Sequence, residues 1–339
     1  MSTHGSTRSG PRYRFLTGAD LVDLLPMDAA IGAVEAIMRD AAAEAASARG
    51  RTIESVSRPG DAADCTFLVM PGIWAARHAA GAKVISFLPD NPAFGRASVQ
   101  GLAILLDLET GLPRLVADAA ALTTIRTGAV VGLASRYLAN EDAEVLGIIG
   151  TGGLAFDLVA GVMAERRIQR VVAYDKDRRR AEAFVMGLPW RAEVASSADK
   201  AAAEADILIT ATTSREPVVP AAAIGPGTHI NAVGNFFAEC RELEGATVAA
   251  CTRYVDDVWN ALIEAGELLL AAEEGLIPSG TAGIAGDLPS LVTGLAEGRT
   301  SPEQLTLFKT VGTALSDVAC LVAAADAAEA RDIGTLVEG

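Results

Sequence analysis

The feature that most constrains the fold is an apolar run that leads directly into a glycine-rich turn, residues 145–156 (VLGIIGTGGLAF). Gly150, Gly152 and Ala155 have the spacing G-x-G-x-x-A. In this pattern the small residues permit a tight turn, a close approach of the backbone to a pyrophosphate, and close packing of a helix on a sheet. The next apolar run ends at Asp175, 20 residues beyond Ala155, where a carboxylate can bind an adenosine ribose. The order strand, glycine turn, helix, strand and acid predicts a dinucleotide-binding domain.

Length and charge exclude several classes of protein. A chain of 339 residues, half of them hydrophobic, suits two domains with large cores. The net charge of −15, with no basic tract longer than residues 178–180, opposes binding to nucleic acid or to an anionic membrane. The longest charge-free run, 217–238, contains three prolines and predicts no membrane helix. Residues 1–14 are polar and predict a disordered tail, not a signal peptide.

Metal ligands and disulfides are not expected. The four cysteines are far apart, form no C-x-x-C pair, and make no ligand spacing with the three histidines. These residues are Cys65, Cys240, Cys251, Cys320, His4, His78 and His229. Free thiols fit a reducing compartment, so we expect a soluble, cytoplasmic protein without a metal site.

The first part of the chain combines a helix with consecutive strands. Residues 21–46 have helical periodicity, and Thr17 or Asp20 is available as a cap. Short apolar runs at 66–70, 82–87 and 101–106 predict an antiparallel sheet, with turns at 71–72, 89–92 and 109–113. Residues 123–138 are expected to form a helix that leads into the dinucleotide-binding domain.

After Asp175 the chain alternates between segments with helical periodicity and short apolar runs typical of strands. This alternation indicates a parallel sheet wrapped by helices. Helices are expected at 178–186, 198–203 and 262–272, and strands at 206–210, 228–233 and 253–256. Residues 305–330 are predicted to form one long apolar helix that interrupts this alternation and packs back on the N-terminal domain.

Several segments resemble the ornithine cyclodeaminase/mu-crystallin family. They are KVISFLPDNP at 83–92, SVQG at 98–101, DLETG at 107–111, ALTTIRTGA at 121–129, the glycine turn, NAVG at 231–234 and LFKTVG at 307–312. The similarity covers about residues 15 to 335. It implies an α/β fold in which a Rossmann domain (131–304) is inserted into a discontinuous α+β substrate-binding and dimerisation domain (15–130 and 305–339). It also implies a homodimer, formed through residues before Arg126 with help from the final helix.

The resemblance further implies a nicotinamide cofactor and a small α-amino or α-imino acid substrate. Some members of the family convert ornithine to proline with release of ammonia, whereas others reduce cyclic ketimines or act as alanine dehydrogenases. Their common step is hydride exchange between the nicotinamide and the carbon of a C–N bond, for which the protein supplies orientation and charge.

Four polar residues match positions of the family's site. Lys83 lies in an apolar strand, where a lysine normally points to solvent; directed into a closed pocket, it would transfer a proton or bind the substrate carboxylate. Arg58 matches the arginine that binds this carboxylate as a bidentate fork, with a solvated loop arginine as the alternative. Arg126 matches a residue near the cofactor or the substrate, with a surface salt bridge as the alternative. Ser98 matches a hydroxyl that contacts the cofactor.

Asp175 favours NAD, because its carboxylate would repel the 2′-phosphate of NADP. Lys176, Arg178 and Arg179 could offset this charge, so NADP remains an alternative. Strand ends bind ligands in open parallel sheets, which adds three residues to the expected cofactor site. The complete set is Ser98, Arg126, Gly150, Gly152, Gly153, Ala155, Asp175, Thr212, Thr213 and Val233.

One departure from the family concerns the activity. Phe236 occupies the position of the aspartate that cyclodeaminases carry two residues after the glycine of this segment. A phenyl ring cannot pair with an ammonium group or activate water, although Asn235 or Glu239 could substitute for the acid. We therefore expect an NAD(P)H-dependent reductase of a cyclic ketimine or other α-imino acid, with Phe236 against the substrate. The alternatives are an ornithine cyclodeaminase and a non-catalytic small-molecule-binding protein of the crystallin type.

Overall fold

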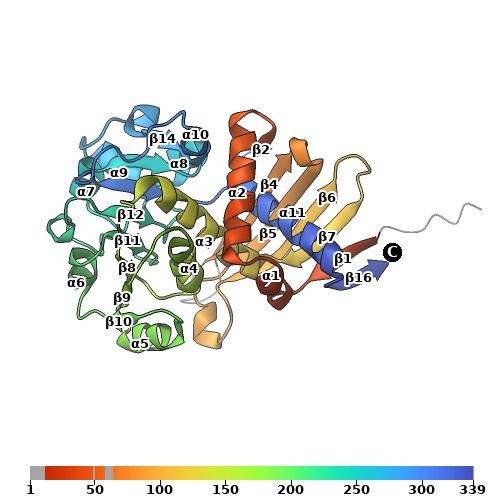
Figure 1. Cartoon of the computed structure of the whole chain (residues 1–339), viewed down its shortest axis with the longest axis horizontal. Helices are drawn as coiled ribbons and strands as arrows, with labels where there is room; N and C mark the ends of the chain where they lie inside the picture. The colour runs from red at the N-terminus through yellow and green to blue at the C-terminus, as the bar shows by residue number, and fades with distance from the viewer. Residues whose placement is uncertain (1–11, 49, 58–63, 339) are drawn as a thin grey trace, which may run out of the picture.

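The computed structural model describes residues 12–48, 50–57 and 64–338, which form two eight-stranded sheets with helices between and around them (Figure 1). The first sheet has the order β16-β1-β7-β6-β5-β4-β2, with β3 also paired to β4. Its strands are β1 (Arg12–Leu16), β2 (Ala46–Ala48), β3 (Thr52–Val56), β4 (Cys65–Trp74), β5 (Ala79–Phe87), β6 (Val99–Asp107), β7 (Pro113–Asp118) and β16 (Thr335–Glu338). Strands β4 to β7 pair antiparallel, as the sequence predicts.

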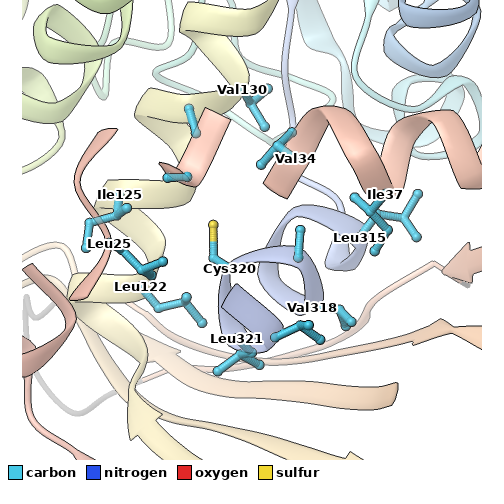
Figure 2. Close-up of a cluster of buried hydrophobic side chains, with 14 of the residues drawn as sticks. Leu25, Val34, Ile37, Leu122, Ile125, Val130, Leu315, Val318, Cys320 and Leu321 are labelled. Carbon is cyan, nitrogen blue, oxygen red and sulfur yellow. The ribbon is translucent and has the colours of Figure 1, made fainter. Parts of the chain in front are cut away.

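In the part of the chain that the structure describes, the α-helices pack on one face of this first sheet, its inner face (Figure 1). Figure 2 shows the core between α2 (Met27–Ala42), α3 (Ala119–Leu138) and α11 (Ala314–Arg331), to which Val34, Leu122 and Leu321 each contribute a buried side chain. Along β4 and β5 the side chains alternate between buried and more exposed, so alternate residues point at α11. This alternation places Lys83 on the covered face, where it is completely buried.

The second sheet is entirely parallel and has the order β10-β9-β8-β11-β12-β15-β13-β14. Its strands are β8 (Val145–Ile149), β9 (Arg170–Tyr174), β10 (Ala192–Val194), β11 (Ile207–Thr210), β12 (His229–Ala232), β13 (Thr252–Val255), β14 (Gly286–Asp287) and β15 (Thr306–Lys309). The helices of this part are α4 (Ala155–Glu165), α5 (Arg178–Gly187), α6 (Ala198–Ala203), α7 (Gly245–Ala250), α8 (Val258–Glu264), α9 (Gly266–Glu273) and α10 (Leu288–Thr293). The strand order reverses between β8 and β11, where such sheets bind dinucleotides.

Helices α3 and α4 join the two halves through a contact between their backbones. A Cβ atom added at Gly128 would overlap the carbonyl oxygen of Asp157, and one added at Gly161 would overlap that of Gly128. A Cβ atom added at Gly132 would likewise lie only 2.5 Å from the carbonyl oxygen of Gly161. Glycine at these positions therefore permits an approach that no side chain would allow.

The structure corrects three predictions in the N-terminal half. Residues 12–14 belong to β1, not to a disordered tail, because β1 pairs with both β7 and β16. The helix expected at 21–46 is two helices, α1 (Gly18–Leu24) and α2, with Pro26 as the N-cap of the second. Thr17 and Asp20 form the capping box of α1. Residues 71–72 lie within β4, and Pro71 is tolerated because β4 changes its partner there from β3 to β2.

Two predicted helices in the C-terminal half also differ from the structure. Of the helix expected at 305–330, residues 306–309 instead form β15, a fully buried strand between β12 and β13. Gly312, with φ of +92°, turns the chain, and α11 then packs on the first sheet. The helix expected at 262–272 is divided between α8 and α9 at Ala265, whose ψ of 82° is not helical.

Candidate active site

A cavity of about 1420 Å³ runs between the two sheets. One wall comes from β4, β5, the loop after β5 and the start of α3, and the other from the glycine turn and the ends of β11, β12 and β15. Nine of the residues expected to bind substrate or cofactor line it: Lys83, Ser98, Arg126, Gly152, Gly153, Thr212, Thr213, Val233 and Phe236.

Two cations share one buried carboxylate at the inner end of this cavity. The Nζ atom of Lys83 donates to Oδ1 of Asp317 at 2.9 Å, and Nε of Arg126 lies 3.1 Å from the same oxygen. All three side chains are almost completely shielded from solvent. Arg126 therefore forms a buried ion pair, not the surface salt bridge considered as an alternative.

Burial lowers the pKa of Lys83 to about 8, and the neighbouring positive charge of Arg126 acts in the same direction. The charge of Asp317 and its hydrogen bond raise this pKa and so oppose part of the decrease. The lysine can therefore exchange a proton near neutral pH, as an acid–base group requires.

Arg51, which the sequence did not single out, provides a third cation in the cavity wall. It pairs with Glu264 through two hydrogen bonds, one of them from Nε at 2.9 Å, and donates to the carbonyl oxygen of Val311 at 2.6 Å. Its guanidinium carbon lies 5.1 Å from the ring centroid of Phe236, within cation–π distance. Arg58, the arginine expected to bind the substrate carboxylate, lies outside the described residues.

An apolar surface adjoins these charges. Phe236 packs edge-to-face on Phe87, with ring centroids 5.8 Å apart, and both residues line the cavity. Leu68, Ile85 and Val99 complete this surface. Neither Asn235 nor Glu239 lines the cavity: the amide of Asn235 binds the carbonyl oxygen of Ser214, and Glu239 pairs with Arg215.

The glycine turn forms the opposite side of the cavity. Gly150 has φ of +95° and lies against the backbone of Ala211, so it makes the tight turn without lining the cavity itself. No atom lies within 4 Å of a Cβ added at Gly152, which leaves its backbone open to a ligand. Ala155 is buried at the start of α4. Asp175 does not line the cavity; its carboxylate accepts from the amide and hydroxyl of Thr151 in the turn, at 2.9 and 3.0 Å.

A second group of buried charges lies behind the ends of β11 and β12. Glu242 accepts hydrogen bonds from the backbone amides of Thr212 (2.6 Å) and Gly234 (2.8 Å) and thereby holds the two strand ends together. Its own backbone amide donates to Glu267, which pairs with Lys309 at 3.0 Å. Burial, and then the nearby charge of Glu267, raise the pKa of Glu242.

Sequence reasoning missed Arg51 and Asp317. Asp317 carried a signal, because it is the one charged residue in the otherwise uncharged stretch 314–325. Arg51 carried none, since its position between two short strands resembles that of any loop arginine. No cluster of three potential metal ligands occurs among the described residues. Within the same part of the chain, no helix has the length and hydropathy to cross a membrane.

A glycine turn at the carboxyl end of a parallel sheet, facing a buried lysine on a second sheet, defines an oxidoreductase of the dinucleotide-binding class. Comparison with known proteins gives the particular family. The chain belongs to the ornithine cyclodeaminase/mu-crystallin family, whose model matches residues 13–332.

Relatives within this family include enzymes that act on imino and amino acids. The chain is 35% identical over 278 residues to a Delta(1)-pyrroline-2-carboxylate reductase of Bacillus cereus (80% of this chain, 85% of the relative). The structure of the Thermococcus litoralis enzyme of the same name, in complex with NADH and L-proline, superposes with a TM-score of 0.91 at 34% identity, covering 96% of this chain and all of the other. An archaeal alanine dehydrogenase dimer with bound NAD gives 0.88 at 31% identity, covering 96% and 99%.

Proposed function

We propose that this protein is an NAD(P)H-dependent reductase of a cyclic α-imino acid, and that in reverse it oxidises the corresponding amino acid. The observation that carries the proposal is the buried group of Lys83, Arg126 and Asp317 in the cavity that the glycine turn also lines. The pyrroline-2-carboxylate reductases among the relatives support the same activity.

The residues present fit a nicotinamide dinucleotide. The pyrophosphate would lie on the open backbone at Gly152 and Gly153, at the N-terminus of α4. Thr212, Thr213 and Val233 would contact the cofactor at the strand ends, and Ser98 from the facing loop. Asp175 would exclude a 2′-phosphate, so we propose NAD over NADP. When bound, the cofactor supplies the hydride.

The protein's own residues would orient the imine and protonate it. Arg51 and Arg126 would bind the substrate carboxylate, which fixes the imine carbon relative to the cofactor. Protonated Lys83 would donate a proton to the imine nitrogen as the hydride reaches the carbon, leaving the amine and a neutral lysine that water reprotonates. Arg58 remains a proposed further contact to the carboxylate.

Charge and polarity favour one substrate class. Within the buried group, three cations, Arg51, Lys83 and Arg126, face two carboxylates, Glu264 and Asp317, so one positive charge remains there when Lys83 is protonated. This charge matches a single substrate carboxylate. The other charged residues that line the cavity are more exposed: Asp90, Arg96 and Arg180. The adjoining apolar surface around Phe236 suits an uncharged ring, and none of the described residues that form it is an acid that could pair with the second ammonium group of ornithine; Asp90 lines the cavity outside this surface.

A spectrophotometric assay tests the function. Purified protein is mixed with Δ1-pyrroline-2-carboxylate, with its six-membered analogue, or with pyruvate plus ammonia, each with NADH and with NADPH. We expect oxidation of NADH in preference to NADPH, fastest with the cyclic imines. Release of ammonia from ornithine without net cofactor reduction would identify a cyclodeaminase instead. Cofactor binding without any turnover would identify the non-catalytic alternative.

We also propose a homodimer formed through the outer face of the first sheet. Phe67, Ile73 and Leu102 point outward from β4 and β6, and each is at least 43% exposed. An apolar face of this kind marks an interaction site. The expected help from the final helix remains a proposal; α11 packs against the inner face and is buried along most of its length.

Light scattering at micromolar protein concentration tests the proposed homodimer and should give a molar mass twice that of one chain. A Phe67→Glu variant should shift this mass toward the monomer; a monomeric parent protein would refute the proposal.

The domain division also remains a proposal, with β15 (306–309) assigned to the Rossmann domain because it pairs within the second sheet. The four free cysteines support a cytoplasmic location.

A further inference from the structure

Asp317 is an isolated carboxylate in an apolar setting. It lies near the N-terminal end of α11, and its neighbours Val318 and Leu321 belong to the hydrophobic core in Figure 2. Its side chain is 1% exposed. Burying a carboxylate costs free energy unless charged partners compensate for the lost hydration. The groups that contact Asp317 are therefore the ones that stabilise its buried charge.

All of the charged contacts of Asp317 converge on one oxygen atom. Oδ1 accepts the hydrogen bond from Lys83 and also lies beside Nε of Arg126. Oδ2 is buried and has no hydrogen-bond partner among the described residues. The carboxylate is therefore not part of an extended structural network. It lies directly behind the two cations that line the cavity.

We propose that Asp317 is a positioning residue that keeps Lys83 protonated and fixed beside Arg126. This inference rests on the proposed function, in which Lys83 donates the proton. Without the carboxylate, two neighbouring cations in a site shielded from water would repel each other, and the lysine, unlike arginine, can lose its proton. Asp317 would thus determine the pH range in which the site can act as an acid.

The other groups around Lys83 cannot replace this effect. From α11, the Cys320 thiol is neutral, because burial raises its pKa to about 12. Arg126 from α3 and Arg51 from the loop before β3 both lower the pKa of Lys83, as does burial. Among the side chains that the structure describes around it, only Asp317 favours the charged lysine. Its removal leaves only influences in the opposite direction.

The composition of the chain allows a direct measurement. Only four lysines occur, Lys83, Lys176, Lys200 and Lys309, so protein labelled with 13C-lysine gives four side-chain signals. Lys176 and Lys200 are exposed and serve as references. The Lys83→Met variant assigns the remaining signal of interest. The 13Cε shift is followed against pH in the absence of cofactor and substrate, so the measurement does not depend on turnover.

We expect the titration midpoint of Lys83 to lie near pH 8 in the parent protein and to fall by about 1 to 3 pH units in Asp317→Asn. Asp317→Glu, which retains the charge, should recover part of the shift. Asp256→Asn is the matched control: Asp256 is equally buried, but its carboxylate binds Thr310 and Gly312, so the Lys83 midpoint should not move.

An unchanged midpoint in folded Asp317→Asn would overturn the proposal. If that variant does not fold, the double variant Arg126→Gln/Asp317→Asn is compared with Arg126→Gln alone: the Lys83 midpoint should be lower in the double variant, because only the carboxylate differs between the two, and equal midpoints would overturn the proposal. Absence of imine reduction by the parent protein would refute the proposed function. The measured titration would still decide the role of Asp317.

Discussion

Replacing Lys83 by methionine is expected to lower the turnover of imine reduction about 100-fold or more. The methionine keeps an unbranched apolar stem of similar length but removes the charge and the transferable proton, and a positioned acid–base group typically contributes 10²–10⁴-fold. The proposed dinucleotide site is the glycine turn on the opposite side of the cavity, so the affinity for the dinucleotide should stay nearly unchanged. Steady-state turnover and a fluorescence titration with NADH measure the two quantities separately.

The pH dependence of the parent protein provides the control for this variant. With the pKa of Lys83 near 8, imine reduction should fall as pH rises through this value, because the ammonium form is lost. Oxidation of the amino acid needs the neutral lysine and should rise over the same range. Lys83→Met should lose both transitions. A folded variant with most of its activity and an unchanged profile would make Lys83 a structural residue only.

Replacing Lys309 by methionine is expected to reduce the free energy of unfolding by about 3–5 kcal/mol, the usual cost of removing one partner from a buried ion pair. Lys309 and Glu267 are both inaccessible to solvent, and the ammonium also donates to the carbonyl oxygen of Asn235 at 2.6 Å. The methionine would leave a buried negative charge and an unpaired carbonyl group. Urea unfolding at fixed protein concentration measures the change.

The double variant Lys309→Met/Glu267→Gln separates the two contributions. Glutamine keeps the acceptor for the backbone amide of Glu242 but removes the charge that lysine compensated. The double variant should therefore be more stable than Lys309→Met alone. Equal stability of the two would show that packing and the lost bond to Asn235, not the unpaired charge, account for the effect.

The dinucleotide half was predictable because its signals are local. A strand, a glycine turn and a helix follow one another within residues 145–165, and the structure places β8, Gly150 and α4 as expected. The strand at 306–309 was not predictable in the same way. A short, wholly buried apolar run has no periodicity that separates a strand from a helix, and its partners β12 and β13 are distant in sequence.

The site was only partly predictable, for a related reason. The family resemblance marked Lys83 and Arg126, but their shared partner Asp317 is 234 residues from Lys83 in sequence. Arg51 likewise is held in the cavity wall by its ion pair with Glu264, which is 213 residues away in sequence. Electrostatic partners on different elements leave no spacing pattern. Only the folded chain shows which carboxylate compensates which cation.

The backbone contact between α3 and α4 has a consequence for how relatives with this fold can diverge. Arg126 and Gly128 lie on one of these helices, and the glycine turn leads into the other. Their separation is therefore fixed by touching main chains and does not depend on the side chains around the cavity. Phe236, a proposed substrate contact, lies on a separate loop, so its exchange should alter the accepted substrate without moving the turn relative to Arg126. Substrate preference and hydride geometry can thus change independently, which makes the cavity wall a suitable region for redesign.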